Sequence, residues 1–225
     1  MGQPSVSVVI PARDEAGVVA HAVRSVCAEA DEVIVVDGAS RDATASLART
    51  EGARVVPSAP SRGVQLDVGA RAARGDWLVF LHADTRLEPG WRDALCGAAA
   101  DAPGGAFRFA IDSPRTAYRA IEAAVALRCR TLLLPYGDQA LFARRSAYAA
   151  AGGFPPIPLM EDVVFVRRLR RLGPLALLRH RALTSARRWE RHGVLGASAR
   201  NLWLLALYSA GAPPERLARA YGARP

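Results

Sequence analysis

The sequence predicts an α/β fold, in which a mainly parallel mixed sheet is flanked by helices and followed by a C-terminal helical tail. Short apolar runs rich in Val and Ile alternate with segments of helical periodicity through the first half of the chain, which is the pattern of β-α-β units. These runs are apolar at successive positions, as in strands that are buried on both faces. The chain has 225 residues, of which 51% are hydrophobic, and this length can bury the core of one substantial domain.

The first half is expected to hold the parallel part of the sheet. Strands are predicted over residues 5–10, 32–36, 53–56 and 77–81, and helices over residues 14–30, 42–51 and 64–73. Asp14 or Glu15 is placed to cap the first of these helices, and Asp42 the second. The short spacing between strands predicts right-handed crossover connections.

The second half is less regular. We expect helices over residues 89–100, 114–131, 146–151, 161–172 and 191–210, a last helix after Pro213–Pro214, and strands over residues 104–111, shortly after 136–139, and over 175–178. The strand over residues 104–111 is expected to be antiparallel or at an edge. The chain is therefore divided into a domain over residues 1–190 and a helical extension over residues 191–225, which packs on that domain or on a membrane surface.

The charge is strongly basic. The formal net charge is +9, and all 30 basic residues are Arg. Nine of these lie between residues 167 and 191. Because the guanidinium group binds phosphate and carboxylate, this segment could face an anionic substrate or a membrane, or it could simply be a solvated helix face.

Cysteine usage and hydropathy favour a cytoplasmic protein. Cys27, Cys96 and Cys129 are odd in number and widely spaced, which argues against a disulfide framework and a zinc site. The N-terminus lacks the pattern of a signal peptide. The apolar stretch over residues 202–210 is shorter than the roughly 20 residues that span a bilayer. Peripheral contact with the inner face of the membrane stays open.

Three carboxylates are expected to gather above one edge of the sheet. Asp37 follows the second predicted strand, Asp84 follows the fourth, and Asp162 begins a helix after a Gly-Gly-Phe turn. Ligands bind at the carboxyl ends of strands in open α/β sheets. Each of these side chains could instead cap a turn, but three gathered carboxylates favour a cation or a polar ligand.

Several stretches of the chain occur in the order and approximate spacing seen in a known family. These are SVSVVIPARDEAGVV, EVIVVDGASRDAT, RGVQLDVGARAARGDWLVFLHADT, GGF and the Glu161–Asp162 pair. Together they resemble family 2 glycosyltransferases with the GT-A fold. YGDQALFARRSAY, PLMEDVVFVRRL and SARRWERHG resemble a bacterial subgroup, the radical-SAM/selenodomain-associated transferase 2 type. The resemblance covers roughly residues 6–191.

The resemblance implies a role for each matching residue. Pro11, Ala12 and Glu15 would surround the base and ribose, Asp37 would contact the nucleoside, Asp84 would bind Mn²⁺ or Mg²⁺ on the donor diphosphate, and Asp162 would be the general base. Arg188 and Trp189 would lie near the diphosphate and acceptor. The expected substrate site also includes Arg62, Gln65, His82, Ala83 and Asp138, with Arg62 as a fixed positive charge for the leaving phosphates. Glu161, next to Asp162, could share or replace the base role.

The sequence departs from the family pattern at three positions. His82 stands where the first Asp of the metal motif is usual, so metal binding would rest on Asp84, with His82 or water. Asp67 replaces the usual Asn before the strand, which alters local hydrogen bonding. Ser185 replaces the Gln of a motif found in processive members, which argues against a processive synthase.

The expected function is metal-dependent transfer of a sugar from a nucleotide-diphosphate donor to an acceptor hydroxyl. One base and no nucleophile imply inversion. The acceptor is unidentified, and a lipid-linked or phosphorylated molecule would suit the basic last third. A nucleotidyltransferase is the first alternative, although PARDEAG is not a Gly-rich triphosphate loop. A nucleic-acid-binding protein is the second, and the shortage of aromatic residues among the arginines disfavours it.

Overall fold

The computed structural model describes residues 3–98 and 101–221 of the chain. The strands are β1 Val6–Ala12, β2 Glu32–Asp37, β3 Arg54–Pro57, β4 Trp77–Phe80, β5 Thr85–Leu87, β6 Gly104–Asp112, β7 Leu141–Arg144 and β8 Ala176–Ser185. The helices are α1 Val19–Cys27, α2 Thr44–Thr50, α3 Arg62–Ala72, α4 Trp91–Ala98, α5 Ala117–Leu132, α6 Arg145–Ala150, α7 Glu161–Leu169, α8 Arg187–His192, α9 Val194–Ser209 and α10 Pro214–Tyr221, with a 3₁₀ turn, η1, at Gly137–Gln139.

The strands form one mixed sheet. In the described part of the chain its order is β3-β2-β1-β4-β7-β6-β8-β5. β3, β2, β1 and β4 are parallel to one another, β7 is antiparallel to both β4 and β6, and β6 is parallel to β8. The predicted α/β class, with its mainly parallel sheet and helical tail, is confirmed. β6 was expected to be antiparallel or at an edge. It is antiparallel to β7 but parallel to β8, and it lies inside the sheet between these two strands, so the edge position was wrong.

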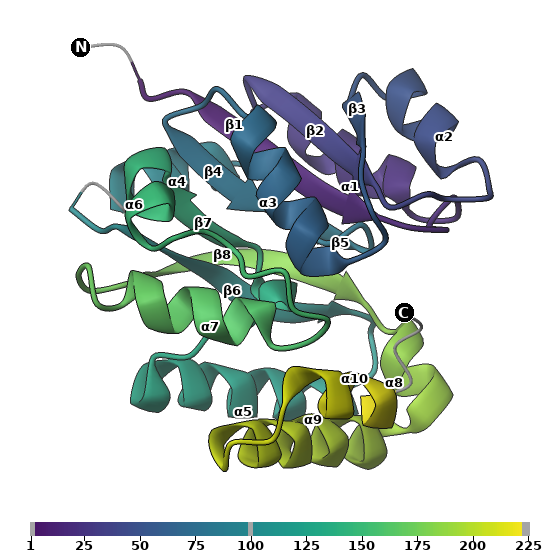
Figure 1. Cartoon of the computed structure of the whole chain (residues 1–225), viewed down its shortest axis with the longest axis vertical. Coiled ribbons are helices and arrows are strands. Elements are labelled where there is room, and N and C mark those ends of the chain that lie inside the picture. Colours follow the sequence, from purple (N-terminus) through teal and green to yellow (C-terminus); the bar gives the residue numbers. More distant parts are fainter. Residues whose placement is uncertain (1–2, 99–100, 222–225) are drawn as a thin grey trace.

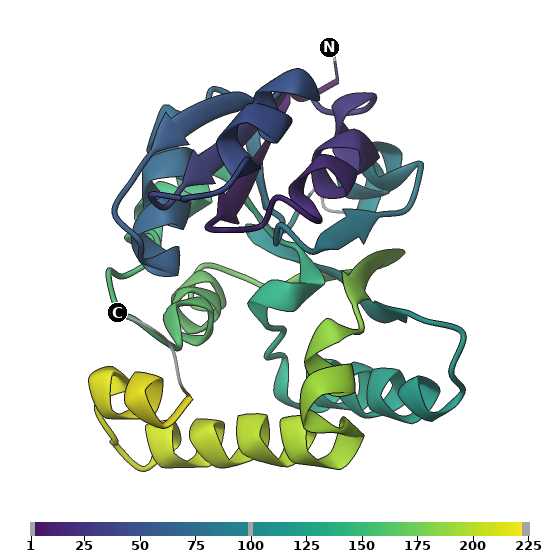
Figure 2. The ribbon, with the colours of Figure 1, turned by 90° about the vertical axis from the view of Figure 1, so that its right-hand side faces the viewer.

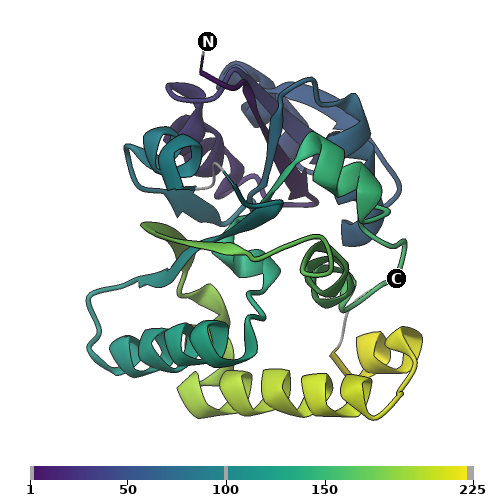
Figure 3. The same cartoon turned by 90° about the vertical axis from the view of Figure 1, so that its left-hand side faces the viewer.

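Helices cover both faces of the sheet (Figure 1). On one face, α1 and α4 pack on a cluster that includes Val23, Trp77 and Leu95. On the other face, α3, α6 and α7 pack on a cluster that includes Leu66, Phe80 and Phe165. α5 and α9 form a further layer below α7, as the turned views also show (Figure 2, Figure 3).

The structure corrects the expected start of the first helix. α1 begins at Val19, and its N-cap is Val18, with no side-chain cap. Asp14 has a φ of 54°, and its carboxylate accepts the Arg41 backbone N–H at 2.8 Å. The Glu15 carbonyl, rather than its carboxylate, accepts the first helical N–H groups. Asp14 therefore joins two loops instead of capping a helix.

The second half contains two further differences. The expected helix over residues 191–210 is two helices, because Gly193 has a φ of 72° and separates α8 from α9. The expected strand over residues 175–178 continues to Ser185 as β8, because β6 and β5 both supply hydrogen-bonding partners along its length. β5 itself was not predicted from the sequence, and residues 99–100 of the expected 89–100 helix lie outside the described residues.

Candidate active site

The ends of β1 and β2 are held together by a buried amide. Gln65 on α3 is 5% exposed, and its Nε2 donates to the Ala12 carbonyl at 2.9 Å and to the Val36 carbonyl at 2.8 Å. A Cβ at Gly38 would lie 2.9 Å from the same nitrogen, so only glycine fits beside it. Pro11 and Ala12 are buried at the end of β1. This edge of the site is therefore preorganised.

Asp37 has an open hydrogen-bond acceptor at the carboxyl end of β2. Its Oδ2 accepts the Ser40 backbone N–H at 3.3 Å. Its Oδ1 is buried, and no hydrogen-bond partner reaches it within the described residues. Buried polar atoms are normally paired, so a ligand donor is the natural partner of this oxygen.

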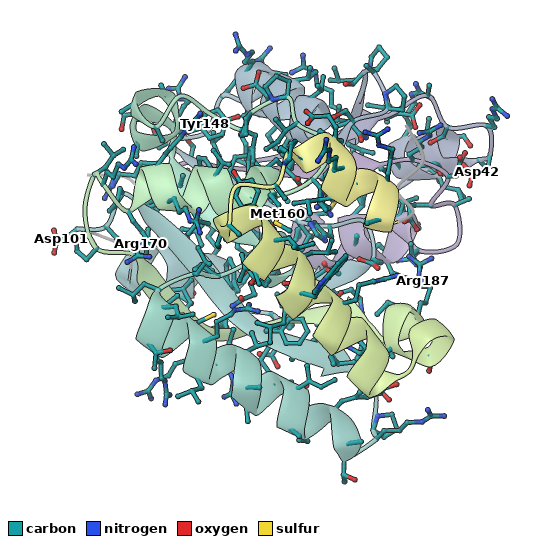
Figure 4. The ribbon with its side chains drawn as sticks, turned by 60° about the horizontal axis from the view of Figure 1, so that its bottom comes forward. Asp42, Asp101, Tyr148, Met160, Arg170 and Arg187 are labelled. Carbon is teal, nitrogen blue, oxygen red and sulfur yellow. The ribbon has the colours of Figure 1, made fainter. Side chains whose placement is uncertain are left out.

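Arg187 connects two carboxylates of the site. Its Nη2 lies 2.9 Å from Glu15 Oε2 and 3.4 Å from Asp84 Oδ2, and it reaches them from the start of α8 (Figure 4). Burial raises the pKa of Glu15; Arg187 opposes this rise and Asp84 adds to it. Ala83, beside Asp84, is buried. The guanidinium thus offsets part of the negative charge of two neighbouring acids.

Asp162 is fixed by two backbone N–H groups. Its Oδ1 accepts from Val163 and its Oδ2 accepts from Gly137 of η1, both at 2.8 Å. A Cβ at Gly137 would lie 2.9 Å from His82 Nε2 and 3.3 Å from Asp162 Oδ2. His82, from the loop after β4, and Asp162, from α7, therefore meet at the same glycine.

Glu161 points in a different direction from its neighbour. It is 1% exposed and forms an ion pair with Arg62. Burial raises its pKa, Arg62 opposes this rise, and Asp162 adds to it. Met160, which precedes it, has a φ of 69°, in the left-handed region that is costly for a residue with a Cβ. This turn sends Glu161 into the protein and Asp162 toward the cavity.

A pocket with a volume of about 80 Å³ surrounds the Asp162 carboxylate. Its polar lining comes from Arg62, His82, Tyr136, Asp138 and Asp162. Its apolar lining comes from Leu159, Met160, Val163, Leu204 and Leu205. α7 and α9 therefore wall a space that opens beside the carboxylate, and Met160 is visible under α9 and α10 in Figure 4.

The metal-binding potential of the site rests on Asp84. The described residues contain no group of three or more His, Cys, Asp or Glu side chains that could hold a metal ion. The Asp84 side chain is 25% exposed, so solvent and ligands can reach it. Mg²⁺ sites commonly use one or two carboxylates, substrate phosphates and water. The residues present fit a cation of that kind and do not form an all-protein cage.

Comparison with known proteins identifies the family. The family model described as glycosyl transferase family 2 matches residues 7–146, which is more than half of the chain. The chain belongs to glycosyl transferase family 2. The matched segment contains Asp37, Gln65 and Asp84, whereas Asp162 and Arg187 lie after it.

Solved structures of similar fold include a synthase that was determined with metal ions and nucleotides. Glucosyl-3-phosphoglycerate synthase from Mycobacterium tuberculosis with Mn²⁺ and uridine-diphosphate-glucose is 25% identical, with a TM-score of 0.63 over 93% of this chain and 80% of that chain. The same synthase with Mn²⁺, uridine-diphosphate and glucosyl-3-phosphoglycerate is 23% identical, with a TM-score of 0.64 over 93% and 81%. A mycobacterial protein is 25% identical, with a TM-score of 0.56 over 79% of this chain and 65% of that chain.

A curated relative shares a shorter stretch. A TPR repeat-containing protein of Synechococcus elongatus is 35% identical over 89 residues, which are 39% of this chain and 22% of that protein. The match therefore spans about a fifth of the relative's length.

Of the expected site residues Arg188 and Trp189 of this family 2 chain, Trp189 belongs to a buried aromatic cluster. Trp189 is 6% exposed and packs with Phe109 and Tyr118, at ring-centroid distances of 5.9 and 6.3 Å. The side chain of Arg188 lies outside the described residues. The guanidinium that contacts Asp84 belongs to Arg187, which sequence reasoning missed. Its position beside the Arg-Trp pair of SARRWERHG was the available signal.

Proposed function

We propose that this family 2 chain transfers a sugar from a nucleotide-diphosphate donor to an acceptor hydroxyl, with a divalent cation, by inversion and without processivity. The observation that carries the proposal is the meeting of Asp162 and His82 at Gly137. Both side chains line the pocket, and His82 belongs to the same loop after β4 as Asp84. An acceptor in the pocket would therefore lie near the donor phosphates.

The donor side begins at the ends of β1 and β2. Asp37 Oδ1 would accept a hydrogen bond from the nucleoside, and the Gln65 amide keeps the adjoining backbone in place. Asp84 would hold Mn²⁺ or Mg²⁺, which supplies Lewis-acid stabilisation of the leaving diphosphate. Arg187 adds a fixed positive charge beside it, and preorganised charges of this kind favour a transition state in which negative charge develops.

Asp162 would act as the general base. As the acceptor oxygen forms its bond to the anomeric carbon, the bond from that carbon to the diphosphate oxygen breaks, and the acceptor proton passes to the Asp162 carboxylate. The nucleoside diphosphate leaves with the electron pair. A single displacement of this type inverts the anomeric centre. The Gly137 and Val163 N–H groups keep the carboxylate oriented toward the pocket.

The acceptor class is suggested by the pocket lining. Arg62 contributes a guanidinium, while Leu159, Met160, Val163, Leu204 and Leu205 contribute an apolar wall. A phosphorylated or lipid-linked hydroxyl compound suits this combination. The Mycobacterium tuberculosis synthase was determined with bound glucosyl-3-phosphoglycerate, which supports the phosphorylated class by analogy.

A thermal-shift panel tests the donor and the metal together. UDP, GDP, CDP and TDP are each added with and without Mn²⁺ to the wild type, to Asp84→Asn, and to the exposed matched control Asp101→Asn. A ligand at 100 times its Kd adds about 2.7 kcal/mol, which raises the Tm by roughly 5–10 °C for a domain of this size. We expect one nucleotide to give this rise only with Mn²⁺ and to fail with Asp84→Asn alone. No shift with any nucleotide would refute the proposal.

A further inference from the structure

The outer side of α5 is apolar. Tyr118, Glu122 and Cys129 are its buried residues and face the sheet. Leu127 lies two positions before Cys129, which is about 200° round a helix, and it is 63% exposed. The exposed residues beside it on the helix surface are Ala120, Ala123 and Ala124. This side of α5 carries no charge along two turns.

The outer side of α9 has the same character. Leu204 is 2% exposed and packs with Leu159 and Leu217. Leu202 and Trp203 are 68% and 53% exposed, and residues 201–214 contain no charged side chain. Large exposed apolar side chains that gather on one surface of a protein mark a binding surface.

The two apolar sides belong to one surface. α5 and α9 contact each other, and all views place them together on the side away from β1–β3 (Figure 1, Figure 2, Figure 3). The α5/α9 face consists of the outward residues Ala120, Ala123, Ala124, Leu127, Leu202, Trp203 and Ala206. It lies at the front of Figure 4.

The helices that form the α5/α9 face carry an excess of positive charge. Residues 115–133 and 194–221 contain seven Arg and two Glu, and one of the two, Glu122, is buried in an ion pair with Arg119. An apolar helix side with exposed Arg nearby, such as Arg130 of α5, is the pattern of helices that lie in the interface of an anionic bilayer. A two-fold contact between copies of this chain would instead bring the same arginines together, which is unfavourable.

α9 connects this face to the active-site pocket. Leu204 and Leu205 line the pocket that holds Asp162, while Leu202 and Trp203 of the same two turns point outward. We propose that the α5/α9 face docks on a bilayer of anionic lipids, so that the acceptor pocket lies at the membrane boundary. This rests on the proposed function only for the identity of the pocket; the docking itself does not depend on it.

Vesicle flotation of the whole chain tests the docking. The probes are phosphatidylcholine vesicles with and without phosphatidylglycerol, at low and at high salt. The test variant is Leu202→Asp with Trp203→Asp, and its matched control is Ser46→Asp with Thr50→Asp, which adds the same charge on exposed positions of α2. We expect wild type and control to bind the anionic vesicles, less at high salt, and the test variant to bind at least about 100-fold more weakly.

Two further measurements separate the outcomes. Circular dichroism melting should show that the test variant is folded, because both replaced side chains are exposed. A second variant, Arg130→Glu, reverses one charge at an exposed position of α5, and we expect it to weaken vesicle binding about 5- to 30-fold. Wild type that fails to float, or a test variant that floats like wild type, would overturn the docking. So would light scattering that shows a dimer which the test variant abolishes. Mn²⁺-dependent nucleotide binding is measured on the same samples, so a failure of the proposed function would be seen independently.

Discussion

Arg187 and Glu15 form an ion pair between residues that are 172 positions apart in the chain, with Nη2 and Oε2 separated by 2.9 Å. The same Nη2 lies 3.4 Å from Asp84. The end of β8 is thus fastened to the first loop of the sheet, at the position where the proposed donor phosphates and cation would bind. The Arg187 guanidinium thus supplies positive charge beside the Asp84 carboxylate.

Arg187→Met should therefore make the protein dependent on Mn²⁺ for stability. Without the guanidinium, Glu15 and Asp84 lack their shared counter-charge, and we expect a loss of about 1 kcal/mol because all three side chains are partly exposed. Mn²⁺ alone should recover this loss and raise the Tm of the variant more than that of the wild type. Arg49→Met, at an exposed position of α2, is the matched control. An equal Mn²⁺ response in variant and wild type would contradict the link between Arg187 and the cation.

Asp162→Asn should abolish most of the transferase rate and leave the fold intact. The amide oxygen can still accept one of the two backbone N–H groups, but the amide cannot take the acceptor proton. General-base catalysis is typically worth about 10²–10⁴-fold, and we expect kcat to fall within this range while donor binding is unchanged. Steady-state kinetics and the thermal-shift panel measure the two quantities. Full activity in this variant would refute the assignment of the base.

Gly137→Ala should impair catalysis more than stability. The new methyl group would lie 2.9 Å from His82 Nε2 and 3.3 Å from Asp162 Oδ2, so one of these side chains must move. Small displacements in an active site can lower the rate by about 100-fold, while overpacking costs about 1–3 kcal/mol. Gly97→Ala on α4 is the control, because its Cβ would meet nothing within 4 Å. If Gly137→Ala retained the wild-type kcat, the proposed proximity of His82 and Asp162 would have no catalytic importance.

Glu161→Gln should change how stability depends on pH. Burial raises the pKa of Glu161, against the effect of Arg62. Above a pH of about 4.3, the ordinary pKa of Glu, the folded chain therefore holds more proton at this residue than the unfolded chain. The free energy of unfolding of the wild type should consequently fall as the pH rises toward the raised pKa.

The amide side chain of the Glu161→Gln variant does not titrate, so its contribution to stability does not change with pH. The difference in free energy of unfolding, variant minus wild type, should therefore increase over the same pH window and then level off. Urea unfolding of both proteins at a series of pH values gives the difference directly. Titrating groups that do not interact with Glu161 are common to both proteins and cancel. A difference that decreases with pH would mean that the pKa of Glu161 is lowered, and that the ion pair with Arg62 outweighs burial.

The parallel half of the fold could be predicted because its strands are buried on both faces. Val8, Val35 and Val79 are all fully buried, so continuous apolar runs revealed β1, β2 and β4. Their carboxyl ends then located Asp37 and Asp84. For β1 and β2, local sequence was sufficient because each of these strands is followed directly by a helix.

The antiparallel half depends on contacts between distant residues. β8 has exposed Arg179 and Arg181, which weaken its apolar pattern. It is completed by pairing with β5, whose residues lie 95 to 99 positions earlier in the chain. The identity of the arginine at Asp84 depends on where β8 ends and how α8 begins. If β8 ended one residue earlier or later, a residue next to Arg187 in the sequence would lie beside Asp84 instead. Local sequence therefore could not identify which arginine contacts Asp84.

The family 2 match ends at residue 146, before α7, β8, α8 and α9. The segment after it supplies Asp162, Leu204 and Leu205 to the pocket, whereas Asp37 and Asp84 come from the segment before. In the proposed reaction, a designed chimera that replaces the later segment would change the base and the apolar wall of the acceptor pocket, while it would keep Asp37, Asp84 and the polar lining from Arg62, His82, Tyr136 and Asp138. The condition for such an exchange is that the incoming segment brings an arginine to the position of Arg187, where it must meet Glu15 and Asp84 of the retained part.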